Sequence, residues 1–435
     1  MFSKRTVREI DLKGKRVLLR ADYNVPLKDG QISDDYRIKQ SLETVKYILD
    51  QEDTSLVIIS HLGRPDGKVD PEMSLAPVAK RLGELLEKEV AFAADCIGDE
   101  AKNAASALQQ GGVLLLENLR FHPEEEKNDP EFAQQLVEAS GAEIFVQDGF
   151  GVVHRAHAST EAITKLLPAV AGLLLEREVD TITKTMQDPA RPLVAVVGGA
   201  KISDKIDVLN KLIEIADCVA VVGALANNFL LAQGHKVGKS LIEPEALDTA
   251  KDVLEQARQA ESRREFNFLV PVDAVVSTST DGKAPTRVVD LSSNTLADIQ
   301  AYPKVPPPEA SAVAAEEMVL DIGPISAAYI AGAIKTCKTV IWAGPCGVTE
   351  TKGLSGAEAP FAHGTKIVVD AMIGSTNNHT NKPFSLVGGG DTVAYVESEN
   401  LVEDFNHVST GGSASLELMS GKALPGVEAL LNKEA

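Results

Sequence analysis

The chain has few cysteines, no long apolar run and no leader-like start, and each of these shortages excludes a class of protein. Its four cysteines are Cys96, Cys218, Cys337 and Cys346, and their spacing fits neither a disulfide framework nor a zinc knuckle. We expect them to be small buried residues in a reducing compartment. No apolar stretch is long enough to span a bilayer, and the first ten residues lack the apolar segment of a signal peptide. A cytoplasmic protein with no membrane partner is therefore predicted.

Basic residues are outnumbered by acidic ones. The chain has 43 Lys and Arg against 63 Asp and Glu, which gives a net charge of −20 at pH 7. Nucleic acids and anionic membranes need a basic face on their partner, so neither is expected to bind. Any site for a polyanionic substrate must then be a local basic island, and the basic residues inside motifs become informative.

The length of the chain predicts two domains. A chain of 435 residues is too long for one ordinary core. The apolar fraction of 44% and the charged fraction of 24% are typical of globular proteins. A helical stretch over 173–186, ended by Asp188 and Pro189, is the expected connector. We therefore predict a first domain over 1–172, an interdomain helix over 173–188 and a second domain over 189–414.

Short aliphatic runs alternate with longer amphipathic stretches along both halves. Strands are predicted at 16–20, 56–59, 113–116, 144–146, 193–197, 219–222, 268–270, 340–342 and 385–387, and helices at 75–87, 132–139, 206–216 and 246–258. This alternation predicts an α/β fold of two doubly wound, Rossmann-like parallel-sheet lobes joined by a helix, with a cleft between them. The proline triplet in 302–308 and the small residues of 353–360 predict two surface loops.

Arginines recur where the predicted strands of the first half end. The motifs are Arg20–Pro26, Asp35–Arg37, Ser60–Pro65, Glu117–Phe121 and Asp148–His157. Open α/β sheets bind ligands at the carboxyl ends of their strands, and the planar guanidinium fork matches phosphate and carboxylate oxygens. One such arginine alone is more often a surface ion pair, but their joint placement favours one anion pocket. We expect that pocket to contain Arg37, Arg64, Arg120, Arg155 and His61, with Asp22 and Asn24 orienting hydroxyl groups; His154 and His157 receive no role.

Glycine-rich turns recur in the second half. They lie in 198–205, 388–392 and 409–413. Glycine lets backbone N–H groups approach a phosphate, and a helix N-terminus favours negative charge. The first turn matches neither the P-loop nor the G-x-G-x-x-G pattern, and alone it fits a tight turn equally well. Asp391 is suited to Mg²⁺, which prefers oxygen ligands, and Glu350 is suited to ribose hydroxyls.

Taken together, these motifs resemble the phosphoglycerate kinase family over residues 17–427. The most specific pieces are 60–65, 117–121, 154–159, 198–205, 388–392 and 408–417. The resemblance implies reversible phosphoryl transfer from 1,3-bisphosphoglycerate to Mg-ADP, giving 3-phosphoglycerate and ATP, by direct in-line transfer after hinge closure. It also implies a monomer whose tail, 415–435, packs back on the first lobe.

The resemblance further implies a role for each matching residue. The glycerate would be bound by Asp22, Asn24, Arg37, His61, Arg64, Arg120 and Arg155. The nucleotide would be bound by Gly199, Ala200, Lys201, Lys205, Gly223, Gly323, Glu350, Asp391 and Thr392, with Asp391 as the magnesium ligand. Arg37 and Lys201 match the charged groups that stabilise the transferring phosphoryl group, assisted by backbone N–H groups near Gly389 and Gly412.

The sequence departs from the family pattern near the nucleotide. Ala343 stands where the family usually has Asn, and Asn227 and Asn228 replace an aromatic–Thr pair. Ser413 replaces a third glycine, and the segment 353–360 is lengthened. These departures predict an altered nucleotide affinity or base preference.

Two alternatives remain open beside an active kinase. A non-catalytic family member acting as a scaffold would be expected to lose charged transfer residues, yet Arg37, Lys201, Lys205 and Asp391 are all present. A phosphotransferase for another small carboxylate would be expected to have a different arginine set in the first lobe, and that set is intact.

Overall fold

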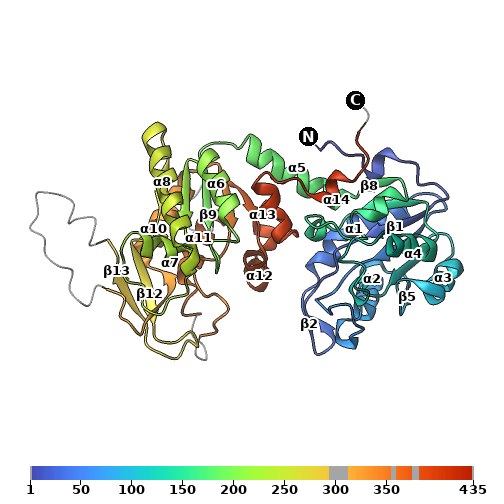
Figure 1. Cartoon of the computed structure of the whole chain (residues 1–435), viewed down its shortest axis with the longest axis horizontal. Helices are drawn as coiled ribbons and strands as arrows, with labels where there is room; N and C mark the ends of the chain where they lie inside the picture. The colour runs from blue at the N-terminus through green and yellow to red at the C-terminus, as the bar shows by residue number, and fades with distance from the viewer. Residues whose placement is uncertain (1, 293–311, 354–358, 375–381, 434–435) are drawn as a thin grey trace, which may run out of the picture. The chain divides into compact units, whose positions relative to one another are not determined.

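The computed structural model describes residues 2–292, 312–353, 359–374 and 382–433, and these fall into two compact units (Figure 1). The first unit comprises Met1–Thr183, Ser413–Leu418 and Lys422–Ala435, and the second comprises Lys184–Gly412 and Met419–Gly421. Helix α5, Leu173–Gln187, contributes residues to both units. Each unit contains one six-stranded parallel sheet, which confirms the predicted α/β fold with two parallel sheets.

The sheet of the first unit has the strand order β5-β6-β4-β1-β7-β8. Its strands are β1 (Arg16–Arg20), β4 (Ser55–Ile59), β5 (Val90–Ala93), β6 (Val113–Leu116), β7 (Ile144–Gln147) and β8 (Ala169–Ala171), and its helices are α1 (Tyr36–Leu49), α2 (Ala76–Leu86), α3 (Gly98–Ala107) and α4 (Pro130–Ser140). The central strands are buried along almost their whole length, as expected for a parallel sheet covered on both faces. A small hairpin, β2 (Leu27–Lys28) and β3 (Gln31–Ile32), precedes α1.

The C-terminal segment belongs to the first unit. It contains α13 (Ser413–Met419) and α14 (Pro425–Glu428). Beyond α14, the Leu431 N–H donates to the carbonyl of Ala169 in β8 at 3.0 Å, and the Arg5 N–H donates to the Leu431 carbonyl at 2.7 Å. The Gly426 N–H donates to the Val153 carbonyl at 2.9 Å. The last residues therefore extend the backbone hydrogen bonding of this unit.

The sheet of the second unit has the order β11-β10-β9-β15-β16-β17. Its strands are β9 (Leu193–Val197), β10 (Cys218–Val221), β11 (Asn267–Leu269), β15 (Thr339–Ala343), β16 (Phe384–Val387) and β17 (His407–Val408). The helices of this unit are α6 (Ile206–Ile215), α7 (Leu225–Ala232), α8 (Leu247–Arg263), α10 (Pro324–Thr336), α11 (His363–Ile373) and α12 (Gly390–Ser398).

A separate antiparallel sheet in the second unit was not anticipated. It consists of β12 (Asp273–Ser277) flanked by β13 (Arg287–Asp290) and β14 (Met318–Ile322). A buried cluster that includes Leu230, Ala274, Val276 and Val289 packs this sheet against α7. These strands are short, so the periodicity of apolar residues in the sequence gives little indication of them.

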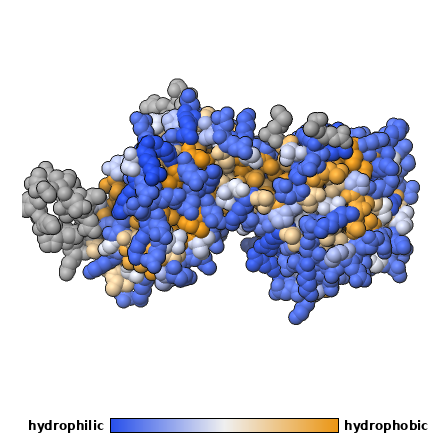
Figure 2. Space-filling view, turned by 45° about the horizontal axis from the view of Figure 1, so that its top comes forward, coloured by the Kyte–Doolittle hydropathy of each residue, from blue (hydrophilic) through white to orange (hydrophobic). Residues whose placement is uncertain are grey.

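The predicted strands agree with the structure to within one residue at each end. The predicted helices also form, although α8 continues five residues beyond the predicted end at Arg258. The predicted loop over 302–308 lies outside the described residues, as does most of the loop over 353–360. None of the helices in the described part of the chain combines the length and the apolar character that a bilayer span needs. Hydrophilic residues cover most of the face of each unit that Figure 2 shows.

Candidate functional site

Arg37 and Asp22 form an ion pair at the carboxyl end of β1. The Arg37 Nη1 donates to Asp22 Oδ2 at 2.8 Å, and the Asp22 side chain is only 5% exposed. Arg37 lies in the first turn of α1, so the expectation that it ends a strand is wrong. The turns around β2 and β3 separate β1 from α1, and the start of the helix brings the guanidinium back to the strand end.

Gly63 connects two further residues of the predicted anion pocket. Its N–H donates to Asn24 Oδ1 at 2.9 Å, and its carbonyl accepts from Arg120 Nη1 at 2.8 Å. Arg120 lies in a short 3-10 helix after β6 and also pairs with Glu126 at 3.2 Å. Arg64 follows Gly63 directly and is exposed. The loops after β1, β4 and β6 are thus held together by backbone and side-chain hydrogen bonds.

His61 and Arg155 complete this group. The His61 Nδ1 lies 3.9 Å from Asp22 Oδ1, and the His61 side chain is 4% exposed. Burial lowers the pKa of His61 well below its usual range, and the cationic charges of Arg20, Arg120 and Arg37 add to the lowering. Burial also lowers the pKa of Arg120, and the nearby Arg155 adds to that effect. The structure therefore brings six of the seven predicted residues into one charged group, and it places Arg64 beside them. We call this group the arginine cluster: Asp22, Asn24, Arg37, His61, Arg64, Arg120 and Arg155.

Two buried charged residues behind the arginine cluster were missed by the sequence reasoning. Arg20 is the last residue of β1 and is 1% exposed, and Glu125 is 0% exposed. A cation that directly follows the apolar run over residues 17–19 is a signal that could have identified Arg20. Glu125 gave no signal, because it stands in a run of three glutamates that is typical of a solvated surface.

In the second unit, the glycine turns after β9 and β15 contact each other directly. The Gly198 N–H donates to the Ala343 carbonyl at 3.0 Å. A Cβ atom on Gly344, whose φ is +122°, would lie 2.2 Å from the carbonyl carbon of Gly198. No side chain fits between the two turns, so glycine is required for a close approach of backbones as well as for ligand access.

A cavity of about 700 Å³ opens beside these turns. Five predicted nucleotide-binding residues line it: Gly199, Ala200, Gly223, Glu350 and Asp391. The wall is largely apolar, with Leu230, Leu241, Val319, Ile322, Val348 and Tyr395 among its residues. A mostly apolar pocket of this size, with a few polar groups at its edge, suits a nucleotide-sized ligand.

Lys205 lies between two glycine turns at the edge of this cavity. A Cβ atom on Gly389 would lie 3.3 Å from Lys205 Nζ, and one on Gly199 would lie 3.4 Å from Lys205 Cε. Burial lowers the pKa of Lys205, whereas the carboxylates of Asp391 and Asp204 act in the opposite direction. The cation is therefore held close to the start of α12, next to Asp391.

The N-terminus of α12 adds unpaired donors to the same place. Gly389 is its N-cap and provides no side chain, so the first N–H groups of the helix have no intrahelical partner. Thr392 Oγ1 is buried and has no hydrogen-bond partner among the described residues, and it lies 3.4 Å from the position of a Cβ on Gly389. A lysine, a helix N-terminus and an unsatisfied hydroxyl together form a site for an anion. We call this group, Lys205, Gly389, Asp391 and Thr392, the anion cradle.

Similarity to known proteins identifies the family of the chain. A family model described as phosphoglycerate kinase matches residues 7–422.

The chain belongs to the phosphoglycerate kinase family.

Relatives and solved structures agree with this assignment. The chain is 45% identical over 432 residues to a phosphoglycerate kinase of Pelotomaculum thermopropionicum and, over the same length, 45% identical to one of Moorella thermoacetica; each match covers 99% of this chain and 100% of the relative. The phosphoglycerate kinase structure from Coxiella burnetii superposes with a TM-score of 0.78 at 35% identity, covering 98% of both chains. The structure from Pyrococcus horikoshii also gives 0.78, at 29% identity, covering 99% of this chain and 98% of that one. The resemblance seen in the motifs is confirmed, and the chain is a phosphotransferase that uses a nucleotide substrate.

Some residues expected at the nucleotide site of a phosphoglycerate kinase lie away from the cavity. Among the described residues, the lining does not include Lys201, which is exposed, or Gly323. Gly323 is the N-cap of α10, and a Cβ there would lie 2.2 Å from the carboxyl carbon of Asp273. Gly412 directly precedes α13 with a φ of +51°.

Two of the departures from the phosphoglycerate kinase pattern, Asn227 and Asn228, are not among the residues that line the cavity, whereas Ala359 of the lengthened segment is. Asn228 Nδ2 donates to the Glu243 carbonyl at 2.7 Å, and Asn227 Nδ2 donates to the Leu241 carbonyl at 3.0 Å. Both asparagines are buried and hold the segment that carries Leu241. An altered base preference stays a prediction, and comparing kcat/KM for ADP and GDP tests it.

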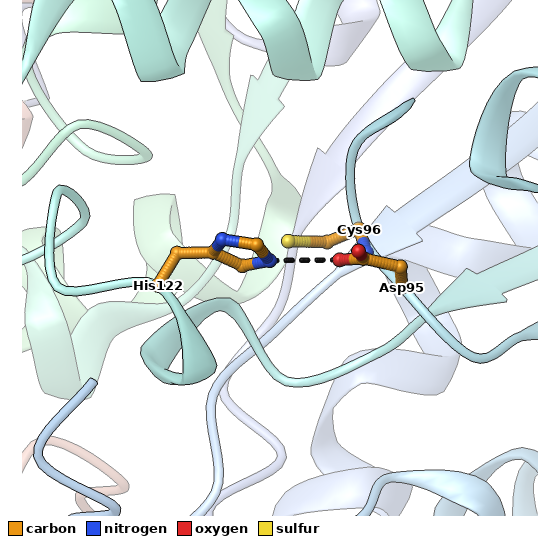
Figure 3. A group of neighbouring side chains, drawn as sticks. All are labelled: Asp95, Cys96 and His122. Atoms are coloured by element: carbon orange, nitrogen blue, oxygen red, sulfur yellow. Dashed lines mark hydrogen bonds and ion pairs between the residues drawn. The ribbon is translucent and has the colours of Figure 1, made fainter. Parts of the chain in front are cut away.

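Asp95, Cys96 and His122 form a third group, apart from the arginine cluster (Figure 3). The His122 Nε2 and Asp95 Oδ1 are 2.7 Å apart, and the imidazole packs against Phe132 with ring centroids 5.3 Å apart. Burial raises the pKa of Cys96 well above its usual range, and the negative charge of Asp95 adds to the shift. A neutral thiol is a poor metal ligand, and the imidazole already has a carboxylate partner, so we interpret the group as a structural contact. All four cysteines are free and buried, as expected.

Proposed function

We propose that the first unit binds the glycerate substrate and the second unit binds the nucleotide, so that a phosphoryl group passes between 1,3-bisphosphoglycerate and ADP to give 3-phosphoglycerate and ATP. The observation that carries this division is that each unit contains its own anion-binding group: the arginine cluster in one, and the anion cradle beside a cavity of about 700 Å³ in the other.

In the first unit, the arginines provide the charge that a glycerate with two anionic groups, one at each end, needs. Arg37 and Arg120 are each fixed by a hydrogen bond at 2.8 Å, which places their guanidinium groups before the ligand arrives. Fixed donors lose less conformational freedom on binding than mobile ones. Asp22 keeps a carboxylate among the arginines, and it would accept a hydrogen bond from the substrate hydroxyl.

In the second unit, the cavity would hold the base and ribose, and the anion cradle would hold the phosphates. Glu350 lines the cavity and offers an acceptor for ribose hydroxyls. Lys205 and the first N–H groups of α12 would bind the phosphate oxygens. Asp391 is exposed in the first turn of α12 and lines the same cavity, so its oxygens fit Mg²⁺, which takes one or two carboxylates together with substrate phosphates. When bound there, the ion would neutralise phosphate charge.

Direct in-line transfer requires little covalent chemistry from the protein. Phosphoryl transfer is catalysed mainly by positioning and by stabilisation of the charge on the transferring group. We assign that stabilisation to Arg37 and Lys201, with backbone N–H groups near Gly389 and Gly412. Because the two substrates bind to different units, transfer requires a closing motion that also excludes water.

The remaining predictions concern the state of the chain in the cell. Both groups of site residues come from one chain, which supports action as a monomer. Free buried cysteines are typical of a reducing compartment such as the cytoplasm. A non-catalytic scaffold role is disfavoured because no charged residue of either group is missing.

Isothermal titration calorimetry tests the assignment of one substrate to each unit. We expect Arg120→Ala to weaken 3-phosphoglycerate binding at least tenfold and to leave ADP binding within about twofold, because a charge-assisted hydrogen bond is removed from one site only. Lys205→Ala should have the converse effect. Lys15→Ala and Lys211→Ala, which break exposed ion pairs with Glu143 and Glu214, are the matched controls. Loss of both ligands in either site variant, with the fold intact, would contradict the division.

A further inference from the structure

Arg20 is a buried cation that the proposed mechanism does not use. It ends β1, next to the arginine cluster, and its side chain is among the largest that are fully buried. Burying a charge is costly unless it is paired and hydrogen-bonded. The Arg20 guanidinium therefore needs charged or hydrogen-bonding partners inside the protein.

One side of the guanidinium is held through Ser159 by a buried carboxylate. The Arg20 Nε donates to Ser159 Oγ at 2.9 Å, and the Ser159 hydroxyl donates to Glu125 Oε1 at 2.6 Å. The Ser159 N–H donates to the other Glu125 oxygen at 3.0 Å. Both carboxylate oxygens thus accept hydrogen bonds, and the direction of the relay is fixed: Arg20 donates to Ser159, which donates to Glu125.

The other side of the guanidinium faces His61. The Arg20 Nη2 lies 3.1 Å from His61 Nδ1. Arginine has five N–H donors and no acceptor, and burial lowers the pKa of Arg20 only to about 10, so it stays protonated at neutral pH. The Nδ1 atom must therefore be the acceptor. An imidazole that accepts at Nδ1 is neutral and carries its proton on Nε2.

A protonated His61 paired with Asp22 is the competing arrangement, and the geometry disfavours it. Asp22 Oδ1 is 3.9 Å from His61 Nδ1, which is longer than the contact with Arg20. The Asp22 oxygens already have partners, because Oδ2 accepts from Arg37 at 2.8 Å and Oδ1 accepts from the Asn24 N–H at 3.2 Å.

The charged groups around the His61 ring also favour a neutral imidazole. Four groups that can carry positive charge face His61 from different elements: Arg20 of β1, Arg37 of α1, Arg120 of the 3-10 helix after β6, and His157 of the loop after β7. Among the residues that the structure describes, the carboxylate of Asp22 alone lies within ion-pair distance of the ring. The other carboxylate close to this group is that of Glu125, whose Oε1 lies 3.8 Å from His157 Nδ1.

We propose that Arg20, held by Ser159 and Glu125, is a positioning residue that fixes His61 as a neutral imidazole whose Nε2–H donates to an anionic oxygen of the glycerate. The inference rests on the proposed role of His61 in binding that substrate. It deepens that role, because His61 then recognises the substrate by a directed hydrogen bond and not by charge. The contribution of His61 to substrate binding should consequently be constant between about pH 5.5 and pH 8, the range in which an ordinary histidine titrates.

Long-range proton–nitrogen correlation spectroscopy of the imidazole rings in the full-length wild-type chain tests the tautomer without a destabilising mutation. The chain has eight histidines, and the spectrum of a His61→Gln variant identifies the signals of His61. We expect the Nε2–H pattern to persist from pH 8 to pH 5.5. A proton on Nδ1, or a ring that becomes doubly protonated near pH 6.5, would overturn the proposal.

A double variant tests the role of Arg20 itself. Arg20→Met combined with Glu125→Gln removes both buried charges, so neither is left unpaired. Met offers no donor to the Nδ1 of His61, so the neutral ring can carry its proton on either nitrogen. A mixture of the two tautomers should therefore replace the Nε2–H pattern of His61, and KM for 3-phosphoglycerate should rise roughly threefold to tenfold.

Arg16→Met is the matched control, since Arg16 lies at the other end of β1 and contacts Ser55 instead of the histidine. It should keep the Nε2–H pattern of His61 and the KM of the wild type. An unchanged Nε2–H pattern in the double variant as well would overturn the positioning role of Arg20. Addition of 3-phosphoglycerate to the wild type should shift the Nε2–H signal of His61; an unshifted signal beside normal activity would remove His61 from substrate binding while leaving the kinase function in place.

Discussion

At the scale of single residues, two contacts in the second unit should affect its free energy of unfolding. The first is the contact between the turns that contain Gly198 and Gly344. The second is Asp321, which lies in β14 and lines the cavity of about 700 Å³ while accepting hydrogen bonds from the Gly364 and Ile322 N–H groups at 2.8 and 2.9 Å. Trp342 is the single tryptophan of the chain and is buried in β15, so its fluorescence reports on the second unit alone.

Gly344→Ala should destabilise the second unit strongly. The new Cβ would lie 2.2 Å from the Gly198 backbone, and the φ of +122° is strained for alanine. Overpacking and backbone strain together should cost about 2–4 kcal/mol. Gly374→Ala is the control, because Gly374 also has a positive φ, of +76°, but no atom of the described residues lies within 4 Å of a Cβ at that position; it should cost about 1 kcal/mol. Urea unfolding followed by Trp342 fluorescence measures both, and equal losses would contradict the contact.

The stability of the second unit should fall with rising pH because of Asp321. Burial raises the pKa of Asp321 to about 7, so the folded state holds a proton on this carboxyl that the unfolded state releases near pH 4. Stability from this group is complete below pH 4 and is lost as the pH rises through about 7, by up to about 4 kcal/mol. The measurement is the difference in unfolding free energy between wild type and Asp321→Asn from pH 4 to pH 8. A difference that does not change with pH would show that the carboxyl titrates normally.

At the scale of secondary-structure elements, the sequence was informative where a pattern is local. Nine strands of the two parallel sheets are mainly apolar runs whose bounds were predicted to within one residue, whereas the short strands β5, β8 and β17 were not predicted. Arg37 was expected at the end of a strand, but the three residues between β3 and Tyr36 lead into helix α1, so Arg37 lies in the first turn of that helix. The antiparallel sheet was missed because its strands are short and because β14 pairs with β12 from far along the chain, which leaves no periodic signal in the sequence.

The candidate site was predictable to a similar extent. The arginines and glycine turns could be identified because they follow strands, which meet at one edge of a sheet. Arg20 and Glu125 could not be assigned roles, because their function depends on which residues lie behind the arginine cluster. The contact of Gly323 with Asp273, which gives that glycine a packing reason, also depends on tertiary structure.

The C-terminal segment gives an element-scale prediction. Leu430 is 3% exposed against the first unit, whereas its neighbour Leu431 is 40% exposed. Leu430→Ala should therefore destabilise the first unit by about 2–4 kcal/mol, through lost burial and a residual cavity, and Leu431→Ala should have little effect because its backbone hydrogen bonds remain. Hydrogen exchange measured by mass spectrometry on peptides of β8 distinguishes the two. Equal protection of β8 in both variants would contradict the proposed packing of the tail.

At the scale of the whole molecule, a strongly acidic chain concentrates its functional cations in two places. The net charge of −20 repels anionic substrates at long range, so the proposed binding relies on the short-range, fixed donors of the arginine cluster and the anion cradle. Membership of the phosphoglycerate kinase family explains why two such places exist, because a phosphoryl group has to be both given and received. The central claim is that both are needed for one transfer reaction.

The most direct test is coupled ATP formation from 1,3-bisphosphoglycerate and ADP with the wild type, Arg37→Ala and Lys201→Ala, beside Lys15→Ala and Lys211→Ala as surface controls. We expect activity in the wild type and in both controls. In each of the other two variants kcat should fall about 100-fold or more, since each removes a group that is proposed to stabilise the transferring phosphoryl group. Full activity in Arg37→Ala or in Lys201→Ala would contradict this proposal.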